Sequence, residues 1–317
     1  MNSSIAVIGA GAWGTALAIL LARAGREVTL WARDAGRAAA MRERRENPRL
    51  PGMVLPPGLE VTAAMPEAGI LLLTVPMQHL RGILPRLPGT GALVLGCKGL
   101  EAKTLLLPPE LAAPRPCAVL TGPNFAHELA AGLPAAAVLA AREAGMRAAL
   151  IAALHTPSLR LYGSADVIGA ALGGAAKNVI AIAAGAVMGA GLGENARAAL
   201  ITRGLAEIAR LAAALGGRAE TVSGLSGLGD LLLTCTGASS RNFSLGFAMG
   251  RGERLEDILA GRSAVTEGVA TAPALAARAR ALGVDMPITQ AVTRLLSGEM
   301  DIPRTLAALM SRDLKDE

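Results

Sequence analysis

The feature that most constrains the fold is a glycine-rich turn close to the start of the chain. Residues 4–8 (Ser-Ile-Ala-Val-Ile) predict a short buried strand, and the glycine-rich run at residues 9–14 follows directly. Residues 15–24 are apolar and helix-forming, and residues 27–31 have a second strand pattern. A strand, a glycine turn, a helix and a second strand in this order predict a βαβ unit.

The glycine spacing in this turn is that of the dinucleotide-binding fingerprint, in the context that the fingerprint requires. The first glycine permits the tight turn, the second lets a pyrophosphate approach the backbone, and the third lets the helix pack against the strand. Backbone N–H groups at the helix start supply the anion site. Glycines also occur at strand–helix turns without a ligand, but the context favours a nicotinamide dinucleotide bound by Gly9, Gly11, Ala12, Trp13 and Gly14.

The end of the second strand bears on which dinucleotide is bound. An acid there usually binds the ribose hydroxyls of NAD, whereas an Arg accommodates the 2′-phosphate of NADP. The chain has Arg33 followed by Asp34. We expect NADP as the cofactor with NAD tolerated, although both side chains are also compatible with ordinary surface charge.

Further apolar runs indicate an α/β fold with two domains. The runs at 69–75, 92–97, 117–121 and 135–140 alternate with helical or turn segments, which is typical of a mostly parallel, doubly wound sheet. Strand patterns end near residue 164, and long helical patterns follow at 166–188, 194–215, 267–283 and 287–297. We predict a doubly wound Rossmann domain over residues 1–164 and an all-helical domain over residues 165–317. The segment 47–58 carries four prolines and predicts an irregular loop.

Composition excludes several other classes of protein. Hydrophobic residues make up 52% of the chain but aromatic residues only 2%, so the core is built from Ala, Leu, Val and Ile. The net charge of +6 is scattered and few aromatics are present to stack on bases, which argues against nucleic-acid binding but suits an anionic cofactor and substrate. Three cysteines without metal-ligand spacing argue against a disulfide framework or a metal site.

Targeting signals are also not indicated. The first residues carry no basic segment typical of a signal peptide, and a reducing cytoplasm is the expected setting. Residues 168–193 form the best membrane candidate, but Lys177 interrupts them. A lysine at the centre of a bilayer costs roughly 2.5–3.5 kcal/mol, so we expect a buried helix and no transmembrane segment.

Candidate substrate groups follow two of the predicted strands. Lys98 comes directly after the run at 92–97, at a carboxyl-terminal strand edge where doubly wound folds bind ligands. Gly122 and Asn124 follow the next strand, so the Asn124 amide is expected to face the same crevice. The alternative for Asn124 is a helix cap.

Lys177 stands out in the middle of the long apolar helix. The chain has only four lysines, and arginine is its usual cation; unlike arginine, lysine readily exchanges a proton. A buried charge is costly unless it faces a cavity, and burial favours loss of the proton. These properties favour a general acid or base. The alternative is a lysine whose ammonium reaches the surface.

A second polar cluster lies further along the chain. Asp230 stands between a glycine and an apolar run, which indicates that its carboxylate pairs with another group. Ser240, Arg241 and Asn242 begin a predicted helix, where charge, hydrogen bonds and the helix dipole together favour a phosphate. The alternative is a capping Asp and a surface Arg.

With these residues the chain resembles the bacterial NAD(P)-dependent glycerol-3-phosphate dehydrogenases. The Lys-Asn pair at 177–178 and the Gly-Leu-Gly-Asp run at 227–230 are specific to that group rather than to Rossmann proteins generally. The matching blocks follow the family order over nearly the whole chain, at residues 9–18, 98–101, 122–126, 176–185, 199–204, 224–230, 233–236, 240–242 and 267–268.

The resemblance implies reversible reduction of dihydroxyacetone phosphate to sn-glycerol 3-phosphate for phospholipid synthesis, and it is compatible with a homodimer. It implies that Lys177 is the catalytic acid and base, with Lys98 and Asp230 orienting the substrate. Further implied substrate contacts are Gly122, Asn124, Ser240, Arg241 and Asn242, and further implied cofactor contacts are Lys98, Ala126, Arg241, Val265 and Glu267. The chain departs from the family at Met77, where a serine commonly follows the proline.

Two other functions compete with this one. A β-hydroxyacid dehydrogenase also pairs a Rossmann domain with a helical domain that carries a lysine, but the Ser-Arg-Asn run argues against a carboxylate substrate. A non-catalytic dinucleotide sensor needs the glycine turn but has no use for Lys98, Lys177 and Asp230 together.

Overall fold

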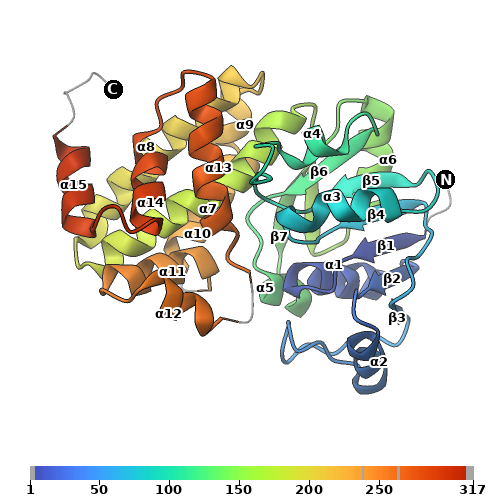
Figure 1. The fold of residues 1–317 in the computed structure, drawn as a ribbon. Helices are drawn as coiled ribbons and strands as arrows, with labels where there is room; N and C mark the ends of the chain where they lie inside the picture. The colour runs from blue at the N-terminus through green and yellow to red at the C-terminus, as the bar shows by residue number, and fades with distance from the viewer. Residues whose placement is uncertain (1–3, 238, 263–264, 312–317) are drawn as a thin grey trace. The chain divides into compact units, whose positions relative to one another are not determined.

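A computed structural model describes residues 4–237, 239–262 and 265–311 of the chain. The chain divides into two compact units (Figure 1). The first comprises Met1–Lys98 with Leu107–Ala171, and the second comprises Gly99–Leu106 with Leu172–Glu317.

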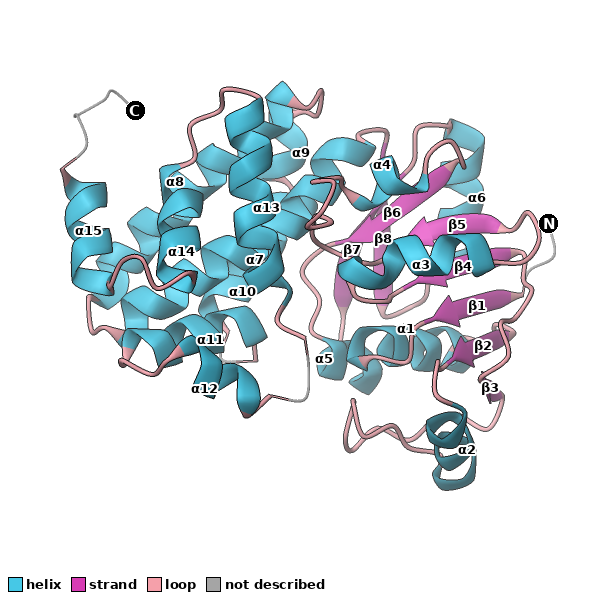
Figure 2. Cartoon of the chain, viewed as in Figure 1, coloured by secondary structure: helices cyan, strands magenta, loops and turns pink. Residues whose placement is uncertain are grey.

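The first unit is built on an eight-stranded sheet with the strand order β3-β2-β1-β4-β5-β6-β7-β8 (Figure 2). Neighbouring strands are parallel except for β6 and β7, which are antiparallel. The doubly wound α/β prediction is therefore confirmed. The strands are β1 (Ile5–Ile8), β2 (Val28–Trp31), β3 (Leu59–Thr62), β4 (Ile70–Leu73), β5 (Ala92–Leu95), β6 (Cys117–Thr121), β7 (Ala135–Ala140) and β8 (Leu159–Ser164).

Helices connect these strands and supply much of the apolar core. All four residues of β1 and of β4 are buried, as expected for central strands of a parallel sheet covered on both faces. The helices of this unit are α1 (Ala12–Arg23), α2 (Ala35–Arg44), α3 (Leu80–Ile83), α4 (Pro108–Ala112), α5 (Ala126–Ala131) and α6 (Ala144–Leu154), with 3-10 turns at Met77–His79 and Leu84–Arg86.

The two edge strands, β3 and β8, were not predicted from the sequence. In β8 Leu159 and Leu161 are buried while Arg160 and Tyr162 are exposed, and β3 alternates in the same way. These half-polar strands lack the continuous apolar runs that mark the central strands.

The second unit is helical. Its central helix, α7 (Val167–Gly189), runs from the first unit into the second and is long and apolar enough to cross a membrane. However, 94% of its most apolar window is buried inside the structure, as expected for a core helix. The other elements are α8 (Gly193–Ala214), α9 (Ala219–Ser223), a π-turn (Leu225–Gly229), α10 (Asp230–Thr236), α11 (Arg241–Gly250), α12 (Leu255–Ala260), α13 (Glu267–Ala281), α14 (Pro287–Leu296) and α15 (Ile302–Met310).

Helices α7 and α11 pack with their backbones in direct contact. A Cβ atom on Gly185 of α7 would lie 2.0 Å from the carbonyl oxygen of Phe243, and one on Gly246 of α11 would lie 1.9 Å from that of Ile182. No larger residue fits at either position without moving a backbone. The glycines therefore set the distance between these two helices.

Glu207 of α8 forms hydrogen bonds with the start of α14. Its carboxylate is buried, with 1% of the residue exposed, and accepts hydrogen bonds from the backbone N–H groups of Ile288 (2.6 Å) and Thr289 (3.2 Å). Helix starts leave such N–H groups without intrahelical partners, so Glu207 caps α14 from another helix. Burial nevertheless raises the pKa of Glu207 to about 7, against the effect of these hydrogen bonds.

We expect this carboxylate to make the stability of the protein depend on pH. Its pKa is higher in the folded state (about 7) than the ordinary value of 4.5 in the unfolded chain. The unfolded chain therefore releases its proton first, and the Glu207 contribution to stability falls as pH rises between these two values, by up to about 1.4 kcal/mol per pH unit.

Chemical denaturation between pH 4.5 and 8 tests this expectation. Glu207→Gln keeps a carbonyl acceptor for α14 but does not titrate, so it should reduce the fall in stability over this range. The exposed Glu256→Gln variant is the control and should keep the wild-type dependence. An unchanged pH dependence in Glu207→Gln would contradict the expectation.

Candidate active site

The glycine turn of the first unit has the geometry that the fingerprint requires. Gly9 has a φ of +122°, which favours glycine. A Cβ atom on Gly14 would lie 2.1 Å from the carbonyl oxygen of Gly9 and 2.3 Å from Oγ1 of Thr74, so helix α1 needs glycine there to approach β1 and β4. No atom lies within 4 Å of a Cβ atom built on Gly11, among the residues that the structure describes. The turn thus fits a pyrophosphate at the start of α1.

The residues beside this turn also suit a bound group. Ala12 is the first residue of α1. The indole Nε1 of Trp13 is buried and has no hydrogen-bond partner within residues 4–237, 239–262 and 265–311. A buried donor left in this state is costly, so a ligand that accepts its hydrogen bond would stabilise it.

Lys98, Gly122 and Asn124 follow neighbouring parallel strands of the sheet, β5 and β6, at the same edge as the glycine turn. The ammonium of Lys98 donates to the carbonyl oxygen of Gly122 at 3.5 Å. Gly122 has a φ of +150°, and a Cβ atom there would lie 2.9 Å from the Cα atom of Ala137. Glycine is therefore needed at this position.

Asn124 does not cap a helix, which resolves one alternative left by the sequence. Phe125 is the N-cap residue of α5, and Nδ2 of Asn124 donates to the carbonyl oxygen of Ala136 at 3.0 Å. Its Oδ1 is buried and has no partner in the described part of the chain. This oxygen remains available to a hydroxyl or amide donor.

The remaining predicted cofactor residues of the first unit lie at the ends of β2 and β6. Arg33 is exposed after β2, and Asp34 caps α2 by accepting a hydrogen bond from the backbone N–H of Arg37 at 2.6 Å. Ala126 is the first residue of α5 and is half-buried.

A buried ion pair lies at the centre of the second unit. The Lys177 ammonium in the middle of α7 pairs with the carboxylate of Asp230, the first residue of α10. Only 8% of Lys177 and 0% of Asp230 are exposed, so both partners of the ion pair are buried. Burial raises the pKa of the neighbouring Cys235 to about 12, although the charge of Lys177 acts in the opposite direction.

A chain of amide hydrogen bonds joins this part of α7 to the predicted phosphate site. Nδ2 of the buried Asn242 donates to Oδ1 of Asn178 at 2.9 Å, and Oδ1 of Asn242 accepts from the backbone N–H of Gly268 at 3.0 Å. Asn178 was not singled out as a site residue from the sequence. A polar side chain within an apolar helix was the signal that could have identified it.

The other residues predicted near the phosphate site lie at the starts of α11 and α13 or just before α13. Ser240 caps α11 by accepting from the backbone N–H of Phe243 at 3.2 Å. Arg241 is exposed at the start of α11 and donates to the carbonyl oxygen of Val265 at 2.6 Å. Val265 is itself exposed, and Glu267 is the first residue of α13.

Met77, the departure from the family pattern, belongs to the core. It is fully buried in the turn after β4, whereas Gln78 and His79 are exposed. The side chain at this position packs in the protein interior.

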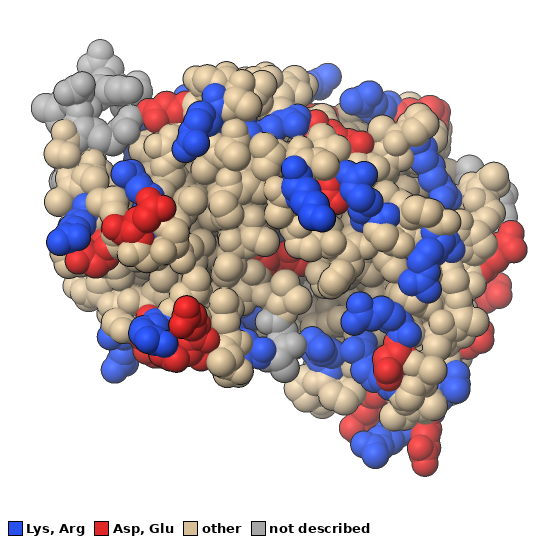
Figure 3. Space-filling view, in the orientation of Figure 1, with Lys and Arg blue, Asp and Glu red and all other residues tan. Residues whose placement is uncertain are grey.

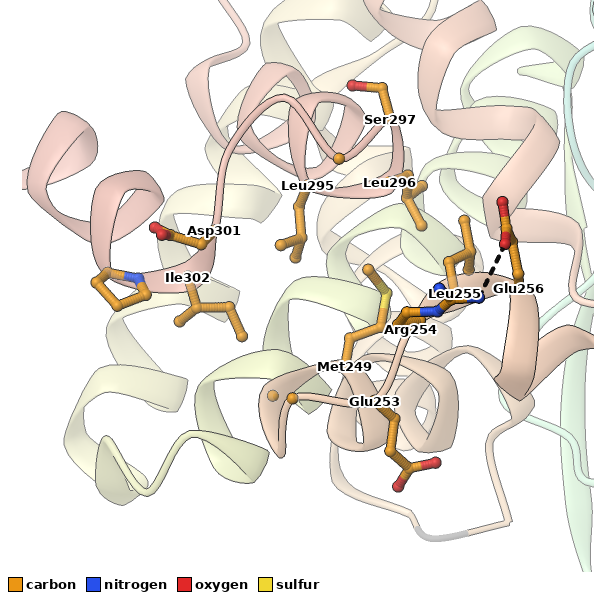
Figure 4. A pocket seen from close by; sticks show the side chains of 14 residues that line it. Met249, Glu253, Arg254, Leu255, Glu256, Leu295, Leu296, Ser297, Asp301 and Ile302 are labelled. Atoms are coloured by element: carbon orange, nitrogen blue, oxygen red, sulfur yellow. Dashed lines mark hydrogen bonds and ion pairs between the residues drawn. The ribbon is translucent and has the colours of Figure 1, made fainter.

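A separate hollow of about 550 Å³ lies in the second unit, where α11 and α14 end and α12 and α15 begin (Figure 4). Apolar side chains such as Met249, Leu295 and Ile302 form its walls. None of the predicted site residues lines it. Charged side chains of both signs are scattered over the face of the molecule shown in Figure 3.

Comparisons with known proteins cover the whole chain. The family models described as the N-terminus and the C-terminus of NAD-dependent glycerol-3-phosphate dehydrogenase match residues 4–147 and 166–307. A glycerol-3-phosphate dehydrogenase (NAD(P)+) of Acidiphilium cryptum is 64% identical, over 100% of this chain and 99% of its own length. A relative with the same name from Sphingopyxis alaskensis is 52% identical, over 98% of this chain and 97% of its own.

The solved structures agree with the family models. The crystal structure of glycerol-3-phosphate dehydrogenase from Coxiella burnetii has a TM-score of 0.92 and 38% sequence identity, and the match covers 98% of this chain and 99% of that one. The chain therefore belongs to the NAD-dependent glycerol-3-phosphate dehydrogenase family.

Proposed function

We propose that this chain catalyses the reversible reduction of dihydroxyacetone phosphate to sn-glycerol 3-phosphate with NADPH or NADH, and that the product supplies phospholipid synthesis. The buried Lys177–Asp230 pair is the observation that carries this proposal. A buried ion pair often stabilises a fold less than apolar residues of similar size would, which favours a functional reason for its presence. Full-length relatives named glycerol-3-phosphate dehydrogenase support the choice of substrate.

Lys177 is the proton donor of the proposed reaction. Its Nζ gives a proton to the carbonyl oxygen during reduction and takes it from the glycerol 2-hydroxyl in the reverse direction. Asp230 accepts a hydrogen bond from this Nζ and so holds the ammonium charged and oriented. The dinucleotide, when bound, supplies or accepts the hydride.

The start of α11 binds the phosphate in this proposal. The exposed Arg241 guanidinium supplies the charge, and Ser240 and Asn242 lie on either side of it in the chain. Asn242 is fixed by Asn178 of α7, the neighbour of Lys177. In the first unit we propose Lys98, Gly122 and Asn124 as substrate-binding residues, with the buried Oδ1 of Asn124 as a hydrogen-bond acceptor.

The proposed cofactor contacts are those expected from the sequence. The glycine turn binds the pyrophosphate through backbone N–H groups, because it offers open space at Gly11 and an unpaired donor on Trp13. The contacts are Gly9, Gly11, Ala12, Trp13, Gly14, Arg33, Lys98, Ala126, Arg241, Val265 and Glu267.

We also propose a cytoplasmic location. Cys97, Cys117 and Cys235 form no disulfide among the described residues, which suits a reducing compartment. The homodimer stays a prediction.

Replacing Lys177 tests its role as the acid. Lys177→Met should lower kcat by roughly 10²–10⁴-fold, because the proton donor is lost. Steady-state assays of dihydroxyacetone phosphate reduction at 340 nm measure the effect, with circular dichroism to confirm folding. The exposed Lys103→Met variant is the control and should keep its activity. Near-normal turnover in Lys177→Met would refute the assignment.

The buried ion pair can be tested by stability measurements without any substrate. Asp230→Leu alone leaves the Lys177 ammonium buried without this carboxylate and should cost about 3–5 kcal/mol in the free energy of unfolding. The double variant Lys177→Met/Asp230→Leu removes both charges and should be more stable than Asp230→Leu alone. If the two substitutions are simply additive, the two charges do not stabilise one another.

Phosphate recognition is assigned to Arg241. Arg241→Ala should reduce the preference for dihydroxyacetone phosphate over dihydroxyacetone by about 10–100-fold in kcat/KM, because a charge-assisted hydrogen bond is lost. Arg251→Ala removes an exposed charge at the other end of α11 and should leave the preference within about twofold. An unchanged preference in Arg241→Ala would show that another group binds the phosphate.

A further inference from the structure

The half-buried Arg262 joins the end of α12 to the start of α11. It follows Gly261, the C-cap residue of α12. Its Nη1 donates a hydrogen bond to the carbonyl oxygen of Arg241 at 2.8 Å, and its Nη2 donates to Oγ of Ser244 at 3.1 Å. Both acceptors belong to the beginning of α11, so this side chain contacts the helix turn that carries the proposed phosphate ligand.

Ser244 strengthens the same contact. Its Oγ donates to the carbonyl oxygen of Arg241 at 3.2 Å while it accepts the hydrogen bond from Arg262. Two side-chain donors thus converge on one main-chain oxygen of Arg241. Helix ends commonly fray, so these contacts fix the main chain of Arg241 at a place where it would otherwise be loosely held.

The side chain of Arg241 is held close to the same contact. Its Nη1 donates to the carbonyl oxygen of Val265 at 2.6 Å. On either side of Val265 in the sequence, Arg262 and Gly268 both bind the start of α11, since the backbone N–H of Gly268 donates to Oδ1 of Asn242 at 3.0 Å. Arg262 therefore bears on the main chain of Arg241 and on the carbonyl group that its guanidinium contacts.

The positive charge of Arg262 is unfavourable at this place unless an anion binds nearby. Burial and the charge of Arg241 lower the pKa of Arg262, while Glu253 acts in the opposite direction. The start of a helix is the positive end of its dipole, which disfavours cations and favours anions. A neutral donor would bind the Arg241 carbonyl oxygen without this repulsion, whereas a phosphate bound to Arg241 would offset it.

We propose that Arg262 is a positioning residue for recognition of the substrate phosphate. It holds Arg241 in the orientation that binds the phosphate, while its own two Nη atoms are engaged with α11. The inference rests on the proposed function in taking Arg241 as the phosphate ligand. It extends phosphate recognition from the start of α11 to a residue at the end of α12.

Substrate preference tests this role in the intact enzyme. Arg262→Gln should reduce the preference for dihydroxyacetone phosphate over dihydroxyacetone about tenfold in kcat/KM, through a higher KM for the phosphate ester. The kcat/KM for dihydroxyacetone should change less than about twofold. Arg254→Gln removes an arginine charge at the other end of α12 and should leave both values within about twofold. Equal losses with both substrates in Arg262→Gln would show a purely structural role and overturn the proposal.

A double-mutant cycle with Arg241 separates positioning from direct binding. In the Arg241→Ala background, Arg262→Gln should lower the preference by no more than about twofold, because the residue that it positions is absent. A further tenfold loss in that background would show that Arg262 acts on the phosphate independently of Arg241. That result would also overturn the positioning role.

The same variants separate this inference from the proposed function. If Arg241→Ala lowers the preference but Arg262→Gln does not, the positioning role is wrong and the phosphate site at the start of α11 stands. If Arg241→Ala leaves the preference unchanged, the phosphate assignment itself is wrong, and the role of Arg262 fails with it.

Discussion

The helical unit is organised around one buried ion pair, between Lys177 and Asp230. A buried ammonium without a counter-charge is strongly destabilising, so α10 must begin beside the middle of α7. Glycines make this approach possible. A Cβ atom on Gly173, one turn before Lys177, would lie 2.5 Å from the carbonyl oxygen of Ser226. The π-turn that precedes Asp230 therefore packs directly against α7.

Asn178, the next residue of α7, makes a second contact between helices. Successive side chains of an α-helix point about 100° apart, so the side chains of Lys177 and Asn178 contact different helices. Lys177 meets α10, whereas Asn178 meets Asn242 of α11. The α7–α11 contact again depends on glycine, at Gly185 and Gly246. One stretch of α7 thus fixes both the proposed proton donor and the start of the helix that carries the proposed phosphate-binding arginine.

The sequence predicted those features that depend on local pattern. The glycine turn, the central strands and the long helices follow from residue spacing, and Lys177 was identified because it is a charge within an apolar helix. The partner of Lys177 lies 53 residues away, and no local pattern encodes such a pairing. The edge strands β3 and β8 were missed because only alternate residues are buried. The hydrogen bonds of Arg37 and Asn47 to the carbonyl oxygen of Ala10 were not predicted, because this glycine turn lies far from both residues in sequence.

The two units hold their proposed ligands by different means, which follows from the unusual composition. With 2% aromatic residues, the chain builds close contacts from glycine and alanine rather than from large side chains. In the first unit this brings the backbone of the glycine turn within reach of a pyrophosphate, so binding depends on backbone N–H groups and on the lack of a Cβ atom at Gly9 and Gly14. In the second unit the same close packing buries Lys177 and Asp230. Electrostatic interactions are stronger away from bulk water, so the Asp230 carboxylate orients the proposed proton donor more firmly there than it would at the surface.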